Sequence, residues 1–353
     1  MTSSLHTLKD QDVIVVGGAG YIGSHVCKMI AQHGGRPITL DNLSSGHAHA
    51  VKWGPLEKVD LRDDDTLEKA FAKWPEAKTV VHLASSIEVG LGEKQPAGFY
   101  HNNVVGALNL LNVMRKSGSD KLIFSSTCAT YGERETMPIR ETDPQAPYSV
   151  YGKTKLAIEH MIESYHAAYG LNYVTLRYFN AAGADSAGEV GEEHDPETHL
   201  IPIALMAAAG ERGPLTLFGT DYDTPDGTCL RDYIHVTDIA RAHILAMAKF
   251  EHGLTDAAIN IGTGQGYSNL EILEMIETVT GHKVPFTKGP RRDGDLLRLY
   301  ADASRANSIL GFGPEHSDLK NIIGTAWRFH KKRGVNKHIL NLACMLSLDQ
   351  EQR

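Results

Sequence analysis

The sequence predicts an α/β protein built on a doubly wound parallel sheet, followed by a smaller mixed α/β part. Short β-branched apolar runs alternate with longer amphipathic stretches through the first half of the chain. Strands separated by helices require right-handed crossovers and a parallel sheet covered on both faces. After about residue 180 the composition shifts to Gly, Pro and acidic residues, and the predicted elements become shorter. This shift predicts a second, smaller domain.

The alternation sets the expected elements and boundaries. We expect a large domain over residues 11–180, a smaller domain over residues 181–330 from which some segments return to the large sheet, and a tail over residues 331–353 without an assigned role. In the large domain the predicted strands are 13–16, 37–40, 79–83, 121–125 and 172–177, and the predicted helices are 22–33, 64–74, 102–116 and 150–169.

Composition excludes several classes of partner. The chain of 353 residues has a formal net charge of −8 and no long run of charges of one sign. It therefore has no basic surface pattern of the kind that binds nucleic acid or an anionic membrane. No apolar run reaches membrane-spanning length, and the first residues lack a signal-peptide core. A reducing cytoplasm fits the cysteines best, because they are far apart and form no disulfide framework: Cys27, Cys128, Cys229 and Cys344.

The histidines predict no metal site. The chain has 18 of them, yet no HExxH helix pattern occurs. The closest pair, His194 and His199, lies in an acidic, Pro-containing stretch that is typical of a loop. We therefore expect no bound metal.

A glycine-rich turn follows the first predicted strand and leads into a helix. Gly17, Gly20 and Gly23 are spaced as the backbone requires for a sharp turn, a close approach to a pyrophosphate and a helix packed against the sheet. The free N–H groups of the helix N-terminus would face the phosphates. Asp41 ends the second strand, where a carboxylate accepts hydrogen bonds from the adenosine ribose and repels a 2′-phosphate. The sequence thus predicts a Rossmann domain that binds NAD.

A tyrosine and a lysine supply the predicted chemistry. Tyr151 and Lys155 are four residues apart, so both side chains lie on one face of a helix. A phenol has an unperturbed pKa of about 10, and a neighbouring ammonium together with an oxidised nicotinamide would stabilise its phenolate. Tyr151 could then take a hydroxyl proton while hydride leaves the same carbon. Thr127, at the end of a predicted strand, could hydrogen-bond the developing carbonyl.

The chain resembles the UDP-glucose 4-epimerase family, also called UDP-galactose 4-epimerase, of the extended short-chain dehydrogenase/reductase superfamily. The matching segments run in family order from about residue 13 to residue 330. They are GGAGYIGSH, LDNLSSG, NNVVGALNLL, FSSTCATYG, YGKTK, LRYFNAAGAD, FGTDYDTPDGTCLRDYIHV and PRRDGDL.

The resemblance implies oxidation of a UDP-sugar at carbon 4 by NAD, rotation of the 4-keto sugar and re-reduction on the opposite face, in a homodimer. Tyr151 would be the base and Lys155 its activator. The family's cofactor contacts match Tyr21, Ile22, Asp41, Asn42, Gly46, Asp60, Leu61, Leu83, Ala84, Asn102, Thr127, Tyr151, Lys155 and Phe179. Its UDP-sugar contacts match Asn180, His199, Leu200, Thr216, Phe218, Arg231, Arg292 and Asp295, with Leu299 bordering the sugar.

Other functions stay open beside this one. Leu299 stands where some members carry a tyrosine, so the smaller side chain could leave space for UDP-N-acetylhexosamines, and UDP-pentoses are a further possibility. A sugar-nucleotide dehydratase is disfavoured, because Cys128 and Ala129 follow Thr127 where such enzymes usually carry an acid and a base. A protein that binds the dinucleotide without turnover would be expected to lack the tyrosine or the lysine, and both are present.

Overall fold

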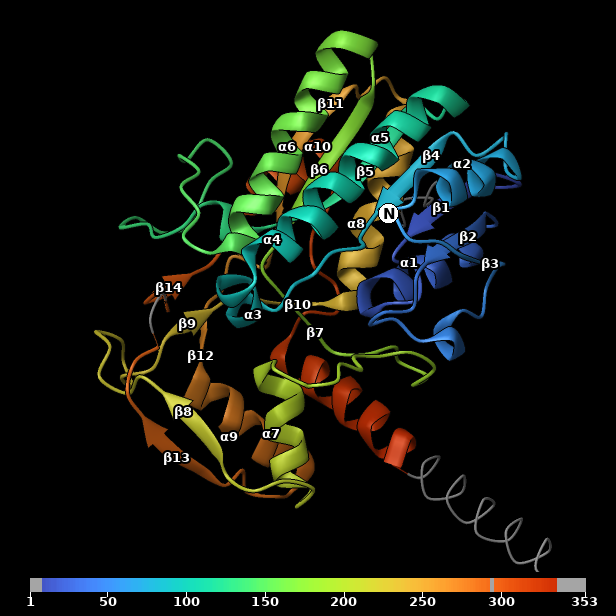
Figure 1. Cartoon of the computed structure of the whole chain (residues 1–353). Coiled ribbons are helices and arrows are strands. Elements are labelled where there is room, and N and C mark those ends of the chain that lie inside the picture. The colour runs from blue at the N-terminus through green and yellow to red at the C-terminus, as the bar shows by residue number, and fades with distance from the viewer. Residues whose placement is uncertain (1–7, 293–294, 335–353) are drawn as a thin grey trace, which may run out of the picture.

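The computed structural model describes residues 8–292 and 295–334. A large parallel sheet with helices on both faces lies above a smaller part made of short strands and helices (Figure 1). The α/β class and the doubly wound parallel sheet that the sequence predicts are confirmed.

The large sheet has seven parallel strands in the order β11-β6-β5-β4-β1-β2-β3. Its central strands are continuous apolar runs buried on both faces, which is typical of parallel sheets. The outer strand β11 comes from the second half of the chain, so that half contributes to both parts. The strands are β1 (Asp12–Val16), β2 (Arg36–Asp41), β3 (Leu56–Lys58), β4 (Thr79–His82), β5 (Lys121–Thr127), β6 (Asn172–Tyr178) and β11 (Asp256–Ile261).

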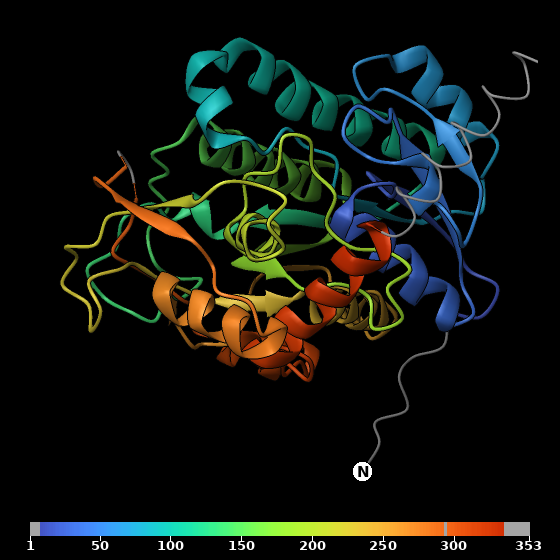
Figure 2. The same ribbon diagram turned by 90° about the horizontal axis from the view of Figure 1, so that it is seen from below.

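Two sets of helices cover the sheet (Figure 2). Helices α1 (Tyr21–Gln32), α8 (Val236–Glu251) and α10 (Ser304–Leu310) pack on one face around a core that includes Val15, Val26 and Ile239. Helices α2 (Asp64–Ala72), α5 (Gly106–Ser117) and α6 (Val150–Tyr169) pack on the other face around a second core. The long helix α6 begins where the Ser149 side chain accepts a hydrogen bond from the backbone N–H of Gly152, and it ends at Gly170, whose φ of +73° favours glycine.

The smaller part consists of paired short strands backed by helices around a third apolar core. Its parallel pairs are β7 (Asn180–Ala182) with β10 (Tyr233–His235) and β8 (Leu215–Phe218) with β13 (Phe286–Gly289). Strand β9 (Leu230–Arg231) lies between β12 (Tyr267–Ser268) and β14 (Arg298–Leu299). Helices α7 (Leu200–Ala208) and α9 (Asn269–Thr280) and a helix over residues 319–334 complete it.

One predicted helix starts later than expected. Residues 102–105 belong to a π-helical turn, Tyr100–Val105, that precedes α5, with α3 (Val89–Lys94) and α4 (Pro96–Phe99) before it. The Asn103 amide oxygen accepts from the backbone N–H of Ser86 at 2.8 Å, and its Nδ2 donates to Thr154 Oγ1 at 3.0 Å. These contacts tie the turn to the chain after β4 and to α6, and π-turns within helices are frequent at functional sites.

The remaining sequence expectations concern the tail, the cysteines and the membrane. The tail assigned to residues 331–353 begins inside the helix over residues 319–334, and its residues 335–353 lie outside the described residues. Cys27, Cys128 and Cys229 are buried free thiols, and Cys344 lies outside the described residues. Among the described residues, every helix is too short or too polar to cross a membrane.

Candidate active site

A cavity of about 940 Å³ extends from the carboxyl ends of the central strands of the large sheet to the smaller part. In open parallel sheets, ligands bind at this edge, where the strand order reverses. Every site residue predicted from the sequence lines this one cavity. They are Gly17, Gly20, Tyr21, Ile22, Gly23, Asp41, Asn42, Gly46, Asp60, Leu61, Leu83, Ala84, Asn102, Thr127, Tyr151, Lys155, Phe179, Asn180, His199, Leu200, Thr216, Phe218, Arg231, Arg292, Asp295 and Leu299.

The glycine-rich turn connects β1 to α1 at one end of the cavity. Gly17 has φ +84°, and a Cβ on Gly23 would lie 2.1 Å from the carbonyl oxygen of Gly17, so neither position accepts a side chain. Helix α1 starts after Gly20 without a side-chain cap and without an acidic residue in its first turn. Its first N–H groups and its positive dipole end are therefore available to an anion.

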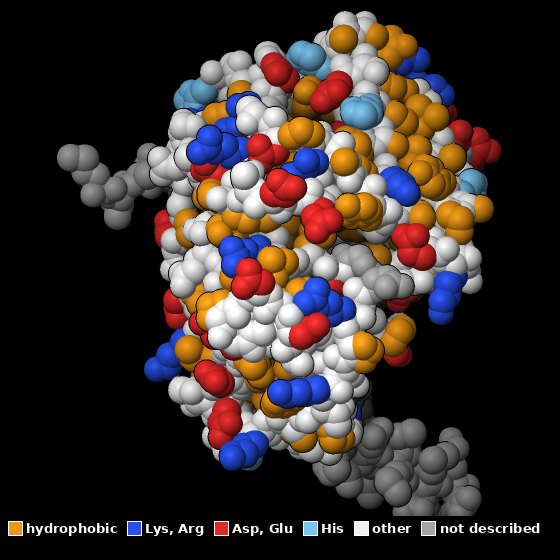
Figure 3. All heavy atoms as spheres, turned by 90° about the vertical axis from the view of Figure 1, so that its left-hand side faces the viewer, with side chains coloured by type: hydrophobic (Ala, Val, Ile, Leu, Met, Phe, Trp, Pro, Cys, Tyr) orange, Lys and Arg blue, Asp and Glu red, His pale blue; other side chains and the backbone are white. Residues whose placement is uncertain are grey.

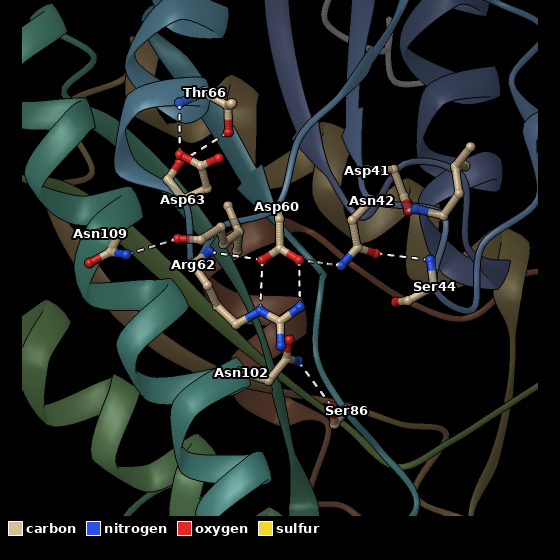
Figure 4. A network of polar contacts seen from close by, with 12 residues as sticks. Asp41, Asn42, Ser44, Asp60, Arg62, Asp63, Thr66, Ser86, Asn102 and Asn109 are labelled. Carbon is tan, nitrogen blue, oxygen red and sulfur yellow. Dashed lines mark hydrogen bonds and ion pairs between the residues drawn. The ribbon is translucent and has the colours of Figure 1, made fainter.

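Two carboxylates lie beside this turn (Figure 4). Asp41 accepts hydrogen bonds from the backbone N–H groups of Ala19 at 3.0 Å and Leu43 at 2.8 Å, so the residue also braces the turn. Burial raises the pKa of Asp41, and these two hydrogen bonds oppose the rise. Asp60 accepts two hydrogen bonds from the Arg62 guanidinium, at 2.8 and 2.6 Å, and this contact lowers its pKa.

The Asn42 side chain links the two carboxylate-bearing loops. Its Nδ2 donates to Asp60 Oδ2 at 3.1 Å, and its Oδ1 accepts from the backbone N–H of Ser44 at 2.9 Å (Figure 4). The loops after β2 and β3 are therefore joined at the cavity wall. In the same view Asn102 donates to Ser86 Oγ at 3.0 Å from the other side.

The predicted catalytic pair lies at the centre of the cavity on α6. Tyr151 and Lys155 share one face of the helix, with the Lys155 Nζ 5.8 Å from the centre of the Tyr151 ring. The Lys155 side chain is buried, and its Nζ donates to the carbonyl oxygen of Ser125 at 2.8 Å. Thr127, at the end of β5, lies beside Tyr151, and its Oγ1 accepts from the backbone N–H of Ala129 at 3.1 Å. The three groups thus face one small region of the cavity.

The protein groups alone raise the pKa of the Tyr151 phenol, and the sequence-based expectation of a stabilised phenolate involves the oxidised nicotinamide as well. Burial and the Cys128 thiol raise the pKa of Tyr151, and a hydrogen bond with Thr127 offsets part of the rise. Burial also lowers the pKa of Lys155 to about 7, although Glu159 opposes this shift. Burial thus disfavours the charged form of each group.

Sequence reasoning missed a buried ion pair one helical turn from Lys155. Glu159 lies one turn after Lys155 on α6, and Arg177 on β6 donates to it from Nε at 3.1 Å and from Nη2 at 2.6 Å. Ser126 on β5 and Gln145 also donate to this carboxylate. The network joins α6 to β5 and β6 where the catalytic residues lie. A contact between Glu159 and Lys155 could have been predicted, because the two residues are four apart on one helix. No comparable spacing points to Arg177, which lies on a different element.

Two arginines and an aspartate form the opposite end of the cavity. Arg231 Nη1 donates to the carbonyl oxygens of Leu230 at 2.9 Å and Leu296 at 2.7 Å, and Nη2 lies 3.9 Å from Asp295. Arg292 pairs with the same carboxylate at 3.0 Å. Asp295 therefore holds both guanidinium groups at one wall, where they can face an anionic ligand.

Comparison with known proteins supplies the family. Residues 13–262 match the model of the NAD dependent epimerase/dehydratase family. A UDP-glucose 4-epimerase of Rhizobium meliloti (strain 1021) is 48% identical over 328 residues, covering 92% of this chain and 99% of the relative. The chain belongs to the UDP-glucose 4-epimerase family.

Solved structures agree with this assignment. UDP-glucose 4-epimerase from Brucella ovis, in complex with NAD, is 50% identical, with a TM-score of 0.88 over 90% of this chain and 98% of that one. The enzyme from Stenotrophomonas maltophila, with bound NAD and formylated UDP-arabinopyranose, is 35% identical, with a TM-score of 0.89 over 92% of this chain and 99% of that one. The Rossmann-type fold of this family member is thereby confirmed.

Proposed function

We propose that this enzyme interconverts UDP-galactose and UDP-glucose by transient NAD-dependent oxidation at carbon 4, rotation of the 4-keto sugar and re-reduction. One observation carries the proposal above the others: a single cavity contains the dinucleotide turn, the tyrosine and lysine pair, and the two arginines. The names of the relatives and of the NAD-bound structures support the same activity.

The residues at the glycine-rich end fit NAD. The uncapped N-terminus of α1 suits a pyrophosphate, and the glycines leave no Cβ between backbone and ligand. Asp41 at the end of β2, without a following arginine, favours a free ribose 2′-hydroxyl over a phosphate. The remaining contacts to NAD would come from the cavity wall, including Tyr21, Ile22 and Asn42. When bound, NAD supplies the hydride acceptor and, once reduced, the hydride donor.

The residues on α6 and β5 handle the proton. Tyr151 takes the proton of the sugar 4-hydroxyl and returns it after rotation, with Lys155 as the neighbouring charge that stabilises the phenolate. Thr127 hydrogen-bonds the oxygen at carbon 4 and keeps it beside Tyr151. Burial raises the pKa of Tyr151, so its phenolate, the form that can accept a proton, needs neighbouring positive charge from Lys155 and, when NAD is bound, from the oxidised nicotinamide. This dependence on the cofactor's charge would keep hydride and proton transfer in step.

The smaller part holds the nucleotide while the sugar turns. Arg231 and Arg292 face the diphosphate, with Asp295 setting their orientation. Asn180, His199, Leu200, Thr216 and Phe218 form the remaining wall, and Leu299 borders the sugar. Epimerisation needs the nucleotide fixed and the sugar free to present either face. An anchor at the diphosphate with a partly apolar sugar wall meets both needs.

The test is to incubate the purified protein with UDP-galactose, with and without added NAD, and to follow the anomeric sugar signals by NMR. The proposal predicts that UDP-glucose appears and no net reduced cofactor accumulates. No UDP-glucose even with added NAD, or a 6-deoxy-4-keto product of a dehydratase, would contradict it. Repeating the incubation with UDP-N-acetylgalactosamine and UDP-xylose ranks the alternative substrates.

We also propose that the enzyme is a homodimer that pairs through its α5 and α6 side. Apart from Phe286, the large exposed apolar side chains of the described residues fall in two segments, 87–108 and 148–169, and include Tyr100, Leu108 and Tyr169. Figure 3 shows hydrophobic side chains gathered toward the upper right of one face. Such patches mark association sites. Light scattering that finds only monomer at micromolar concentration would contradict the dimer. A cytoplasmic location, with participation in galactose metabolism, stays a prediction.

A further inference from the structure

The segment between β7 and α7, residues 183–199, runs along the rim of the cavity and is fastened to the large domain. Lys28 on α1 pairs with Asp185 at 2.7 Å, and Lys52 Nζ donates to the carbonyl oxygen of Glu189 at 2.7 Å. His47 is hydrogen-bonded to the carbonyl oxygen of Glu193 at 3.0 Å. These contacts hold the segment in place from Asp185 to Glu193, beside Tyr21 at the mouth of the dinucleotide turn.

Four side chains of this segment converge, although the sequence predicted no metal site. They are Glu192, His194, Glu197 and His199, and their ligand atoms all lie within 4.8 Å of one another. Glu192 Oε1 is 3.2 Å from His194 Nδ1 and 2.5 Å from His199 Nδ1. The Glu197 carboxylate oxygens are 3.8 Å from His194 Nδ1 and 3.6 Å from His199 Nδ1.

These separations match the edges of a small coordination tetrahedron. Zinc binds imidazole nitrogen and carboxylate oxygen at about 2.0–2.2 Å, so the ligand atoms of a four-coordinate site lie about 3.3 Å apart. The four ligand atoms lie within 4.8 Å of one another, so closing them to that spacing needs shifts of about 1 Å or less per atom. Two imidazoles and two carboxylates are a donor set for zinc and similar transition metals rather than for calcium or magnesium.

A second observation also points to a ligand. Nδ1 of His194 is buried and lies 3.2 Å from Glu192 Oε1 and 3.8 Å from Glu197 Oε2, yet it makes no directed hydrogen bond to either carboxylate. A buried ring nitrogen that faces two carboxylates without donating to either has the surroundings of a metal ligand.

We propose that Glu192, His194, Glu197 and His199 form a binding site for one divalent transition-metal ion, with zinc as the best fit. Two carboxylates and two neutral imidazoles balance the charge of the ion. Because these side chains bind an ion in their deprotonated forms, zinc affinity should increase with pH.

The position of the site links it to the cavity. His199 and Leu200 line the cavity, and His199 directly precedes α7. A bound ion would fix this rim segment in one arrangement and join the residues before the cis Asp195–Pro196 bond to those after it. The four side chains include neither Tyr151 nor Lys155, and the test measures metal binding, so it does not depend on the epimerase activity.

The experiment is a zinc titration of the full-length protein, purified without a histidine tag and dialysed against a chelator. Binding is measured by competition with a chromophoric chelator and by metal analysis after gel filtration. The test variant is the double substitution His194→Ala with Glu197→Gln. The matched control is His330→Ala, because His330 and Glu211 form a surface pair at 3.1 Å with only two ligands.

The proposal predicts one zinc per chain in the parent and in His330→Ala. Loss of an outer-shell partner weakens metal binding by roughly 10- to 100-fold. The double variant loses two direct ligands, so its zinc affinity should fall by more than that. Co²⁺ in the parent should give the intense visible absorption of a four-coordinate ion, while circular dichroism checks that the variants are folded. Equal zinc affinity in the parent and the folded double variant, no saturable binding at all, or the weak spectrum of six-coordinate Co²⁺ would overturn it.

Discussion

The buried ion pair of Glu159 and Arg177, one helical turn from Lys155, gives a stability prediction that the structure can quantify. The side chains of Glu159 and Arg177 are 3% and 4% exposed. In Glu159→Gln, the single amide oxygen can accept from one guanidinium N–H, while the new NH₂ group faces donors. Two hydrogen bonds between charged partners, worth about 1.5–3 kcal/mol each, are replaced by one bond from the guanidinium to a neutral acceptor, and the buried guanidinium loses its counter-charge. We expect a loss of about 3–5 kcal/mol, the usual cost of breaking a buried pair.

The assay is thermal unfolding of the parent and the variant followed by circular dichroism. At about 2 °C per kcal/mol for a chain of this size, Tm should fall by about 6–10 °C. Glu163→Gln is the matched control, because Glu163 lies on the same helix and is exposed, and its Tm should change by about 1 °C or less. An unchanged Tm in Glu159→Gln would refute the reasoning.

The same variant has a separate effect on the pH profile. The Glu159 carboxylate raises the pKa of Lys155, which burial brings down to about 7. Without the carboxylate that pKa falls further, so the ammonium loses its proton at lower pH. The alkaline limb of kcat/KM should therefore move to lower pH, which a purely structural role of Glu159 would not cause.

Three further predictions concern the cavity walls. Gly23→Ala should lose bound NAD, because the new Cβ would lie 2.1 Å from the carbonyl oxygen of Gly17. The loss is measured as a lower ratio of absorbance at 260 nm to absorbance at 280 nm. The control Gly90→Ala should keep the cofactor, because its new Cβ would meet nothing within 4 Å. Arg231→Met should raise KM for the UDP-sugar about tenfold or more with a smaller effect on kcat, whereas the surface variant Arg298→Met should change neither. Leu299→Tyr should reduce turnover of UDP-N-acetylglucosamine relative to UDP-glucose, and equal exclusion by parent and variant would contradict the larger pocket.

Much of the site could be predicted because its residues follow the carboxyl ends of parallel strands. Once β5, β4, β1 and β2 are placed in one parallel sheet, Gly17, Asp41 and Thr127 must meet at one edge of that sheet. The pair Tyr151 and Lys155 is set by helical spacing alone. These relations depend on local periodicity, which a sequence displays directly. They also depend on the right-handedness of parallel crossovers, which is a general rule.

The remaining features depend on contacts that no local pattern encodes. Arg177 meets Glu159 because the register of β6 against β5 turns that side chain toward α6. His194 and His199 converge with two glutamates because an irregular segment folds back on itself, and irregular segments have no period to read. The raised pKa of Tyr151 likewise follows from burial that only the packed structure defines.

The most direct test of the account is the rate at which a Tyr151→Phe protein converts UDP-galactose into UDP-glucose. The variant keeps the ring, the fold and the NAD contacts but has no hydroxyl to carry the proton. The account predicts a rate lower by about 10²–10⁴-fold at unchanged cofactor content. A rate equal to that of the parent would show that another group moves the proton, and the central claim would be wrong.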